Sequence, residues 1–365
     1  MSGATRAVHQ FVPTLDPGAV GQHTLHLQHV LHGMGLESEI FTEDVQDVDV
    51  VTRHLTDHRA DHRSGRDREV LVYQSAIGSV TADYLRSLSQ PLVVNYHNIT
   101  PASWFEGWNG LEQHGLMWGR AQLRQLAARA TVGLSDSRYN EAELVEAGYR
   151  ATAVAPVLID LEALSAHAAD DAGDVEARVG LRVLFVGRVT PNKAQHDLIK
   201  ALAVYRRLYD PRARLHLVGG VAAPRYQTAL EGFVAALGLE EAVTLTGAVP
   251  AGALAAQYRD ADVFVCLSEH EGFCVPLLEA MHHGLPVIAY AAAAVPETLA
   301  GAGVLLTDKS PATVAAAIHA VVSDTGVRDA LVAAGRTRLK DFTLERTRAR
   351  YVELFTDLLG RVDFR

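Results

Sequence analysis

The chain has 365 residues, which exceeds one ordinary hydrophobic core and suits two domains. Hydrophobic residues make up 48% and charged residues 21%, as in a globular protein, and no apolar run approaches the roughly 20 residues of a membrane helix. The formal net charge is −10, of which residues 1–165 carry −8 from 12 Arg, no Lys and 20 acidic residues, and such an acidic half argues against nucleic acid or anionic lipid as partner.

The two cysteines, Cys266 and Cys274, are too few for a disulfide framework, which favours a reducing compartment. Residues 1–6 lack the apolar core of a signal peptide. We therefore expect a cytoplasmic protein with no transmembrane segment.

Short β-like runs alternate with helical stretches through the first half of the chain. This order predicts a mostly parallel sheet covered by helices on both faces. The expected strands are residues 7–12, 39–42, 70–73, 92–96, 131–134 and 151–155, and the expected helices are 21–33, 111–130 and 139–147.

Three polar or glycine-containing segments follow strands of this first half. Residues 16–21 contain Gly18 and Gly21 at a strand-to-helix turn, and His97 ends an apolar strand. Residues 135–140 suit an N-cap cluster for the next helix, with Arg138 as a further candidate ligand contact. Because loops at the carboxyl ends of parallel strands form ligand sites, the first two segments are candidate site elements. The alternatives are a simple strand-helix turn at residues 16–21 and a purely structural role for His97.

Residues 165–180 are rich in Ala, Asp and Gly and have little periodicity, so we expect a linker there. A second alternating series follows, and the sequence after Thr307 is almost wholly helical in pattern. The expected strands are residues 182–186, 215–218, 243–246, 263–267 and 287–290, with a helix at about 195–209 and others between the later strands.

The two series predict an α/β protein with two Rossmann-like, doubly wound parallel-sheet domains facing each other across a cleft, and a helical C-terminal tail. We expect the N-terminal domain to span residues 1–165 and the C-terminal domain residues 166–345. Residues 346–365 are expected to form a helix that crosses back to the first domain.

The loop after the first strand of the second domain carries Gly187, Arg188 and Lys193. Cations in a strand-to-helix loop are placed to reach an anionic ligand, and charge-assisted bonds to phosphate contribute roughly 1.5–3 kcal/mol each. A plain solvated surface loop is the alternative reading of this segment taken alone.

The most informative stretch is residues 268–280, which places Glu271 and Glu279 eight positions apart at a strand–loop–helix junction. Pro276 suits the first helical residue, so Glu271 falls in the loop and Glu279 one turn into the helix. The backbone amides of residues 272–275 would then point out of a helix N-terminus, which favours anions. Carboxylates that accept hydroxyl hydrogen bonds beside such amides indicate a nucleotide sugar as ligand. The alternative is a loop charge and a helix N-terminal acid with a stabilising role only.

The second domain resembles glycosyltransferase family 4, which comprises retaining enzymes of the GT-B fold. The match is strongest over residues 182–297 and weaker in the first domain. It is carried by Gly187-Arg188 with Lys193, residues 217–219, Gly247, residues 261–265, the Glu271-x7-Glu279 pair, residues 284–289 and Pro296-Glu297.

The resemblance implies a role for each matching residue. Arg188 and Lys193 would neutralise the donor diphosphate, Glu271 would bind hydroxyls of the transferred sugar, and Glu279 would hold the ribose. His97 would contact the donor sugar or the reacting oxygen, so the implied catalytic residues are His97, Arg188, Lys193 and Glu271. Further donor contacts are implied for Gly18, Gly21, Gly187, Gly219, Val249, Gly272, Phe273, Cys274 and Val275.

Two positions depart from the commonest pattern of that family. Cys274 and Ala194 stand where glycine is more usual, which puts donor preference in doubt without removing a charged group. Two metal-like patterns are discounted: residues 260–262 resemble a DxD motif but suit the end of a helix and the start of a strand, and His54, His58 and His62 lie in a polar stretch without apolar support.

The resemblance implies an enzyme that transfers a sugar from an NDP-sugar, such as a UDP- or GDP-sugar, to an acceptor hydroxyl, with no metal ion and no cofactor. Since no residue stands out as a nucleophile, we expect a front-face reaction in which the leaving diphosphate takes the acceptor's proton. The acceptor, whether glycan, lipid-linked or small molecule, is not predicted. The alternatives are a nucleotide-sugar epimerase of similar fold and a non-catalytic nucleotide-sugar-binding scaffold.

Overall fold

The computed structural model describes residues 7–46, 48, 50–63, 69–166 and 179–361. Contacts divide the chain into two compact units, and each is described by itself. Unit 1 comprises residues 1–101, 114–159 and 342–365, and unit 2 comprises residues 102–113 and 160–341. The sequence pattern did not predict that residues 102–113 belong to unit 2.

Unit 1 is built on a seven-stranded parallel sheet in the order β3-β2-β1-β4-β5-β6-β7. Its strands are β1 (Ala7–Leu15), β2 (Ile40–Val45), β3 (Arg53–His54), β4 (Glu69–Ser75), β5 (Leu92–Tyr96), β6 (Val132–Ser135) and β7 (Thr152–Val154). The helices that connect or flank them are α1 (Ala19–Gly33), α2 (Leu55–Arg63), α3 (Val80–Arg86), α4 (Gly110–Ala127), α5 (Arg138–Glu146) and α14 (Leu344–Arg361). The short 3-10 helix η1 (Ala102–Phe105) and the start of α4 lie in the segment that belongs to unit 2.

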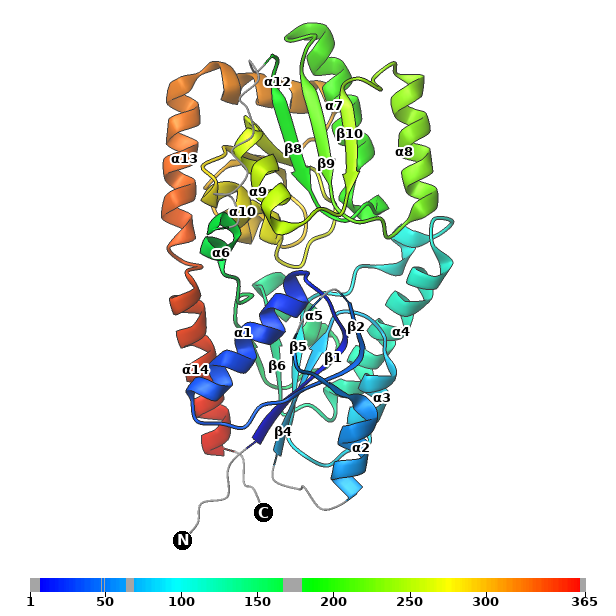
Figure 1. The fold of residues 1–365 in the computed structure, drawn as a ribbon, viewed down its shortest axis with the longest axis vertical. Helices are drawn as coiled ribbons and strands as arrows, with labels where there is room; N and C mark the ends of the chain where they lie inside the picture. Colours follow the sequence, from blue (N-terminus) through cyan, green and yellow to red (C-terminus); the bar gives the residue numbers. More distant parts are fainter. Residues whose placement is uncertain (1–6, 47, 49, 64–68, 167–178, 362–365) are drawn as a thin grey trace. The chain divides into compact units, whose positions relative to one another are not determined.

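One face of the unit 1 sheet is covered by α1 and α14 (Figure 1). Tyr351 and Phe355 of α14 are buried in a cluster with Leu27 and Leu31 of α1, and Tyr351 Oη donates to the carbonyl of Ala155 at 3.1 Å. The last helix of the chain is therefore part of the hydrophobic core that the N-terminal strands begin.

Unit 2 is built on a six-stranded parallel sheet in the order β10-β9-β8-β11-β12-β13, with helices on both sides (Figure 1). The strands are β8 (Arg182–Val186), β9 (Arg214–Val218), β10 (Val243–Gly247), β11 (Val263–Cys266), β12 (Val287–Tyr290) and β13 (Val304–Leu306). The helices are α6 (Leu161–Ala166), η2 (Pro191–Lys193), α7 (Gln195–Leu208), α8 (Pro224–Ala236), α9 (Ala251–Asp260), α10 (Val275–His282), α11 (Val295–Leu299), α12 (Pro311–Ser323) and α13 (Thr325–Leu339).

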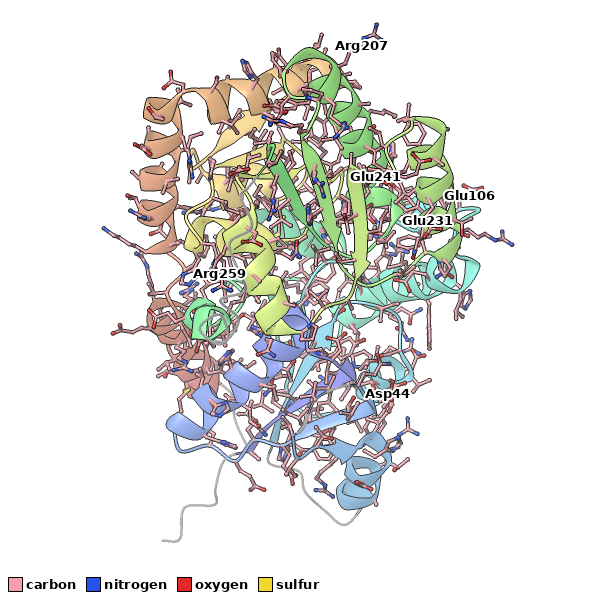
Figure 2. All side chains as sticks on the ribbon, turned by 45° about the horizontal axis from the view of Figure 1, so that its top comes forward. Asp44, Glu106, Arg207, Glu231, Glu241 and Arg259 are labelled. Carbon is pink, nitrogen blue, oxygen red and sulfur yellow. The ribbon has the colours of Figure 1, made fainter. Side chains whose placement is uncertain are left out.

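The predicted α/β class with two doubly wound parallel sheets is confirmed. The central strands β4, β5 and β11 are buried along their whole length, as expected of parallel strands covered on both faces. Charged side chains lie mainly outside: Figure 2 labels Arg207 of α7 and Glu231 of α8, and both are exposed.

The expected linker at 165–180 begins inside α6, and residues 167–178 lie outside the described part. Residues 260–262 do end α9 and lead into β11, as predicted, and Asp262 accepts a hydrogen bond from the Arg182 amide at 2.8 Å. No helix in the described part of the chain combines the length and apolar character that crossing a bilayer requires.

Candidate active site

The strand order of unit 2 brings two loops together. β8 and β11 are neighbours at the centre of the sheet, and the chain leaves them toward opposite edges. In open parallel sheets a ligand binds beyond the carboxyl ends of the strands at this point. Here the loop after β8 carries Arg188 and Lys193, and the loop after β11 carries Glu271.

Backbone hydrogen bonds tie the two loops to each other. The amide of Glu269 donates to the carbonyl of Asn192 at 2.8 Å, and Asn192 Nδ2 donates to the carbonyl of His270 at 3.3 Å. Asn192 is buried and was not identified from the sequence, because its role depends on a partner 78 positions away.

Lys193 and Glu271 form an ion pair between these loops. Lys193 Nζ lies 2.6 Å from Glu271 Oε1, and the two side chains are 19% and 9% exposed. Burial lowers the pKa of Lys193, but the Glu271 carboxylate, together with Cys274 and Cys266, outweighs it and raises that pKa above its ordinary value. The site therefore holds a fixed positive charge beside a carboxylate, as a phosphate-and-sugar ligand requires.

Arg188 lies in the same loop with its side chain turned to solvent. Its guanidinium is 63% exposed and lies 3.7 Å from the Glu112 carboxylate, while its carbonyl accepts a hydrogen bond from Gln195 at 2.9 Å. Gln195 thus holds the backbone of Arg188, while the guanidinium stays exposed to solvent. Arg188 is not part of the Lys193–Glu271 pair.

Glu279 lies on α10, and its carboxylate is held by a tyrosine from α9. Tyr258 Oη donates to Glu279 Oε2 at 2.6 Å, and both residues are buried. Burial raises the pKa of Glu279 above its ordinary value, against the Tyr258 hydrogen bond, which lowers it. Sequence spacing gave no signal for Tyr258, because it precedes Glu279 by 21 positions on another helix.

We expect Glu279→Gln to remove a pH-dependent part of the stability. Since the pKa of Glu279 is raised, the folded chain binds this proton more tightly than the unfolded chain. Glu279 therefore contributes fully to the free energy of unfolding at pH values below its ordinary pKa of 4.5, and this contribution is lost as the pH rises through the raised pKa. Urea unfolding at a series of pH values checks this: the gap between wild type and variant should change across that window, and a constant gap would contradict it.

The two departures from the family pattern share one backbone feature. Ala194 has φ of 51° and Cys274 has φ of 71°, both in the left-handed region that favours glycine. Glycine at these positions would carry no strain, which accounts physically for its frequency there. Ala194 is the N-cap of α7 and Cys274 the N-cap of α10, so both lie where a loop of the site turns into a helix.

The remaining predicted donor contacts of unit 2 lie around these loops. Gly187 follows β8, and Gly219 follows β9 with its Cα close to the Gly187 carbonyl. Val249 is half-buried in the turn between β10 and α9. Gly272 and Phe273 precede α10, which begins at Val275, so Pro276 is its second residue and not the first as expected.

The predicted residues of unit 1 belong to another sheet. Gly18 caps α1, and Gly21 lies so close to Asp16 that an added Cβ would come within 1.8 Å of its carbonyl oxygen. This approach explains why the turn needs a glycine at position 21. The predicted N-cap at residues 135–140 is confirmed, since Ser137 accepts a hydrogen bond from the Asn140 amide.

His97 is bonded on both sides of its ring. Nδ1 lies 3.0 Å from Asp136 Oδ2 and Nε2 lies 2.7 Å from Gln74 Oε1, and the side chain is 2% exposed. Gln74 is bonded in turn to Asn95 and Gln10. The ring is therefore part of a buried polar network, and direct contact with a ligand requires it to exchange one of these partners.

Two histidines of the discounted metal pattern, His54 and His58, bond different partners. His58 is buried and contacts Tyr84 Oη at 2.8 Å and Glu69 Oε1 at 3.1 Å, while His54 is exposed and bonded to Thr56. The expectation that this stretch lacks apolar support is wrong for His58, whose ring packs against Phe11 and Phe41. The His62 side chain lies outside the described residues.

Residues 179–338 match the family model described as glycosyl transferases group 1. A D-inositol 3-phosphate glycosyltransferase of Geodermatophilus obscurus is 32% identical over 65% of this chain and 54% of its own length. The protein of that name from Kineococcus radiotolerans is 32% identical over 73% of this chain and 65% of its own length. The protein of that name from Frankia alni is 28% identical over 93% of this chain and 85% of its own length. The chain thus spans between about half and two thirds of the first two relatives.

Solved structures resemble the whole described fold. Sucrose-phosphate synthase (tll1590) from Thermosynechococcus elongatus has a TM-score of 0.76 at 20% identity, covering 98% of this chain and 100% of its own. Anabaena Alr3699/HepE in complex with UDP-glucose has a TM-score of 0.72 at 19% identity, with 96% and 99% covered. At this identity the likeness shows the fold, which is GT-B. The described chain therefore has the GT-B fold, and residues 179–338 are similar to the group 1 glycosyl transferases.

Proposed function

We propose that the protein is a retaining glycosyltransferase that moves a sugar from a UDP-sugar to an acceptor hydroxyl. The observation that carries this proposal is the Lys193–Glu271 pair at the carboxyl ends of β8 and β11, with Nζ and Oε1 2.6 Å apart. One loop thereby offers a cation for phosphate, and the other a carboxylate for sugar hydroxyls. Both lie at the point of the sheet where ligands of such folds bind.

The other residues of unit 2 have matching roles in this proposal. Arg188, whose side chain is exposed, joins Lys193 in neutralising the diphosphate, and Glu279 binds the ribose hydroxyls with the oxygen that Tyr258 does not use. The loop around Val249 meets the base. Backbone contacts to phosphate or sugar are assigned to Gly187, Gly219, Gly272, Phe273, Cys274 and Val275. Gly18 and Gly21, which belong to unit 1, remain proposed donor contacts from the resemblance alone.

The choice of UDP over other bases is supported by a structural neighbour. Anabaena Alr3699/HepE was solved with UDP and with UDP-glucose. GDP-sugars are the second class to test. The acceptor is proposed from the names of the relatives, which point to a phosphorylated inositol.

The reaction proposed is a front-face transfer without a cofactor. The leaving diphosphate, held by Arg188 and Lys193, takes the proton of the attacking acceptor hydroxyl while the sugar passes through an oxocarbenium-like state. The protein supplies positioning and charge stabilisation. His97 is the proposed contact on the acceptor side, with Asp136 and Gln74 orienting its ring. We place the reaction in the cytoplasm, where the two free cysteines would stay reduced.

A panel of nucleotide sugars with and without D-inositol 3-phosphate tests the proposal. We expect UDP release that depends on the acceptor, and an α-linked product from an α-configured donor. An epimerised nucleotide sugar would identify an epimerase. Saturable UDP-sugar binding without turnover under any condition would favour a scaffold.

We expect turnover to survive removal of divalent metal. The positive charges of Arg188 and Lys193 stand where a metal would otherwise balance the diphosphate. Assays with and without a chelator, at matched ionic strength, should give rates within about twofold, a difference of less than ~0.5 kcal/mol. A rate that vanishes with chelator and returns only with magnesium would contradict metal-independent transfer.

A further inference from the structure

The donor loop of unit 2 carries two thiol side chains that the proposed transfer does not use, next to the Glu271 carboxylate that it does use. Cys266 ends β11 and Cys274 caps α10, and their sulfur atoms lie 3.9 Å apart. One ligand atom from each of Cys266, Cys274 and Glu271 lies within 4.8 Å of the others. All three residues are buried, at 1%, 6% and 8% exposure.

The sulfur separation suits a tetrahedral metal ion better than a bond between the sulfurs. Zinc–thiolate bonds of about 2.3 Å at a tetrahedral angle place two sulfurs about 3.8 Å apart, whereas a disulfide requires about 2.05 Å. The observed 3.9 Å needs almost no movement of Cys266 or Cys274 to accept a cation.

Charge balance also favours a divalent cation. Two thiolates and the Glu271 carboxylate carry three negative charges, and one divalent cation with Lys193 restores neutrality in a buried place. A carboxylate has two oxygens, so Glu271 can keep its bond to Lys193 with one and meet the cation with the other.

We propose that Cys266, Cys274 and Glu271 form a binding site for a soft divalent cation of the zinc class. Sulfur donors select zinc, cadmium and cobalt over magnesium or calcium. Three protein ligands leave a fourth position for water. Binding converts two thiols to thiolates, so each cation bound releases two protons to the solvent.

One ligand of the proposed cation site, Cys274, departs from the pattern of the family that the chain resembles. Cys274 stands where the resembling family more often has glycine, which has no side chain to offer as a ligand. The left-handed backbone at position 274, with φ of 71°, starts the helix in either case. The thiol is therefore an addition to the loop and not a requirement of its backbone.

Cobalt titration of the full chain under a phosphine reductant tests the proposal. Cys266 and Cys274 are the only cysteines in the sequence, so a thiolate-to-cobalt charge-transfer band identifies them without any variant. We expect one tetrahedral cobalt per chain, release of two protons and displacement by zinc. Cobalt binding without the charge-transfer band, or no binding, would overturn the site.

Variants localise the ion further. Cys266→Ser and Cys274→Ser should each weaken cobalt binding at least ~100-fold, since losing a direct ligand costs more than losing a neighbour of one. Glu37→Gln is the matched control, because it removes an exposed ligand from the other group of potential metal ligands, His9, Glu37 and Glu39. Loss of cobalt binding in Glu37→Gln, with both serine variants unaffected, would assign the ion elsewhere.

One consequence rests on the proposed function. A cation on Glu271 occupies the carboxylate proposed for the transferred sugar, so zinc and UDP-glucose should exclude each other. UDP-glucose is therefore expected to displace cobalt, with the charge-transfer band as the signal. If the band persists at saturating UDP-glucose, the exclusion fails while the cation site, measured without donor, stands.

Discussion

Replacing Lys193 with alanine is expected to lower kcat/KM at least ~10-fold, since each decade corresponds to 1.4 kcal/mol and one charge-assisted phosphate bond supplies about that much. The same change leaves the Glu271 carboxylate, 9% exposed, without its partner. Breaking a buried ion pair on one side costs about 3–5 kcal/mol, and the 19% exposure of Lys193 puts the expected loss of stability at the low end. Steady-state kinetics and urea unfolding measure the two effects separately.

Two further variants separate the effect on the ligand from the effect on folding. Lys193→Met with Glu271→Gln removes both charges, so stability should recover relative to Lys193→Ala while activity stays low. Lys200→Ala is the matched control, because Lys200 on α7 is 42% exposed and pairs with Asp197. An unchanged kcat/KM in Lys193→Ala would remove Lys193 from the proposed site.

The sheets could be predicted because buried parallel strands are apolar along their whole length. The expected strands at 92–96, 182–186 and 287–290 coincide with β5, β8 and β12. β3 and β13, edge strands of two and three residues, were not predicted.

The closeness of Lys193 and Glu271 could be predicted from the sequence, because each residue follows an apolar strand, β8 or β11, and both strands are central in the sheet. The contributions of Asn192 and Tyr258 could not be predicted, because each bonds a partner that only the folded chain brings near. The burial of the His97 side chain could not be predicted for the same reason. Its strand-end position suggested an open side chain, but Asp136 and Gln74 come from the ends of neighbouring strands and enclose the ring.

Gly219→Ala is expected to displace the loop after β8, which carries the proposed diphosphate contacts Arg188 and Lys193. The φ of Gly219 is 147°, and an added Cβ would lie 2.2 Å from the Gly187 carbonyl oxygen and 3.1 Å from the Arg188 amide. Contacts under 3.0 Å are essentially never made by real Cβ atoms, so the backbone before Arg188 must move. We expect a loss of about 2–4 kcal/mol in stability from strain and overpacking.

The activity of Gly219→Ala should fall further than its stability alone explains. A displacement of about 1 Å in a positioning element can cost on the order of 10²-fold in rate, so we expect kcat/KM to drop by about that factor at a temperature where the variant is folded.

Two neighbouring glycines distinguish steric contact from backbone strain. Gly247 has φ of 72° with no atom within 4 Å of its added Cβ, so Gly247→Ala carries strain alone, roughly 1 kcal/mol. Gly220→Ala meets only the Ala248 Cβ at 3.8 Å, without a positive φ, so its stability should change by less than about 1 kcal/mol. If contact with the Gly187 carbonyl matters, only Gly219→Ala loses activity. Equal kinetics in all three variants would show that the loop after β8 does not depend on this contact, and that the geometry of Arg188 is set elsewhere.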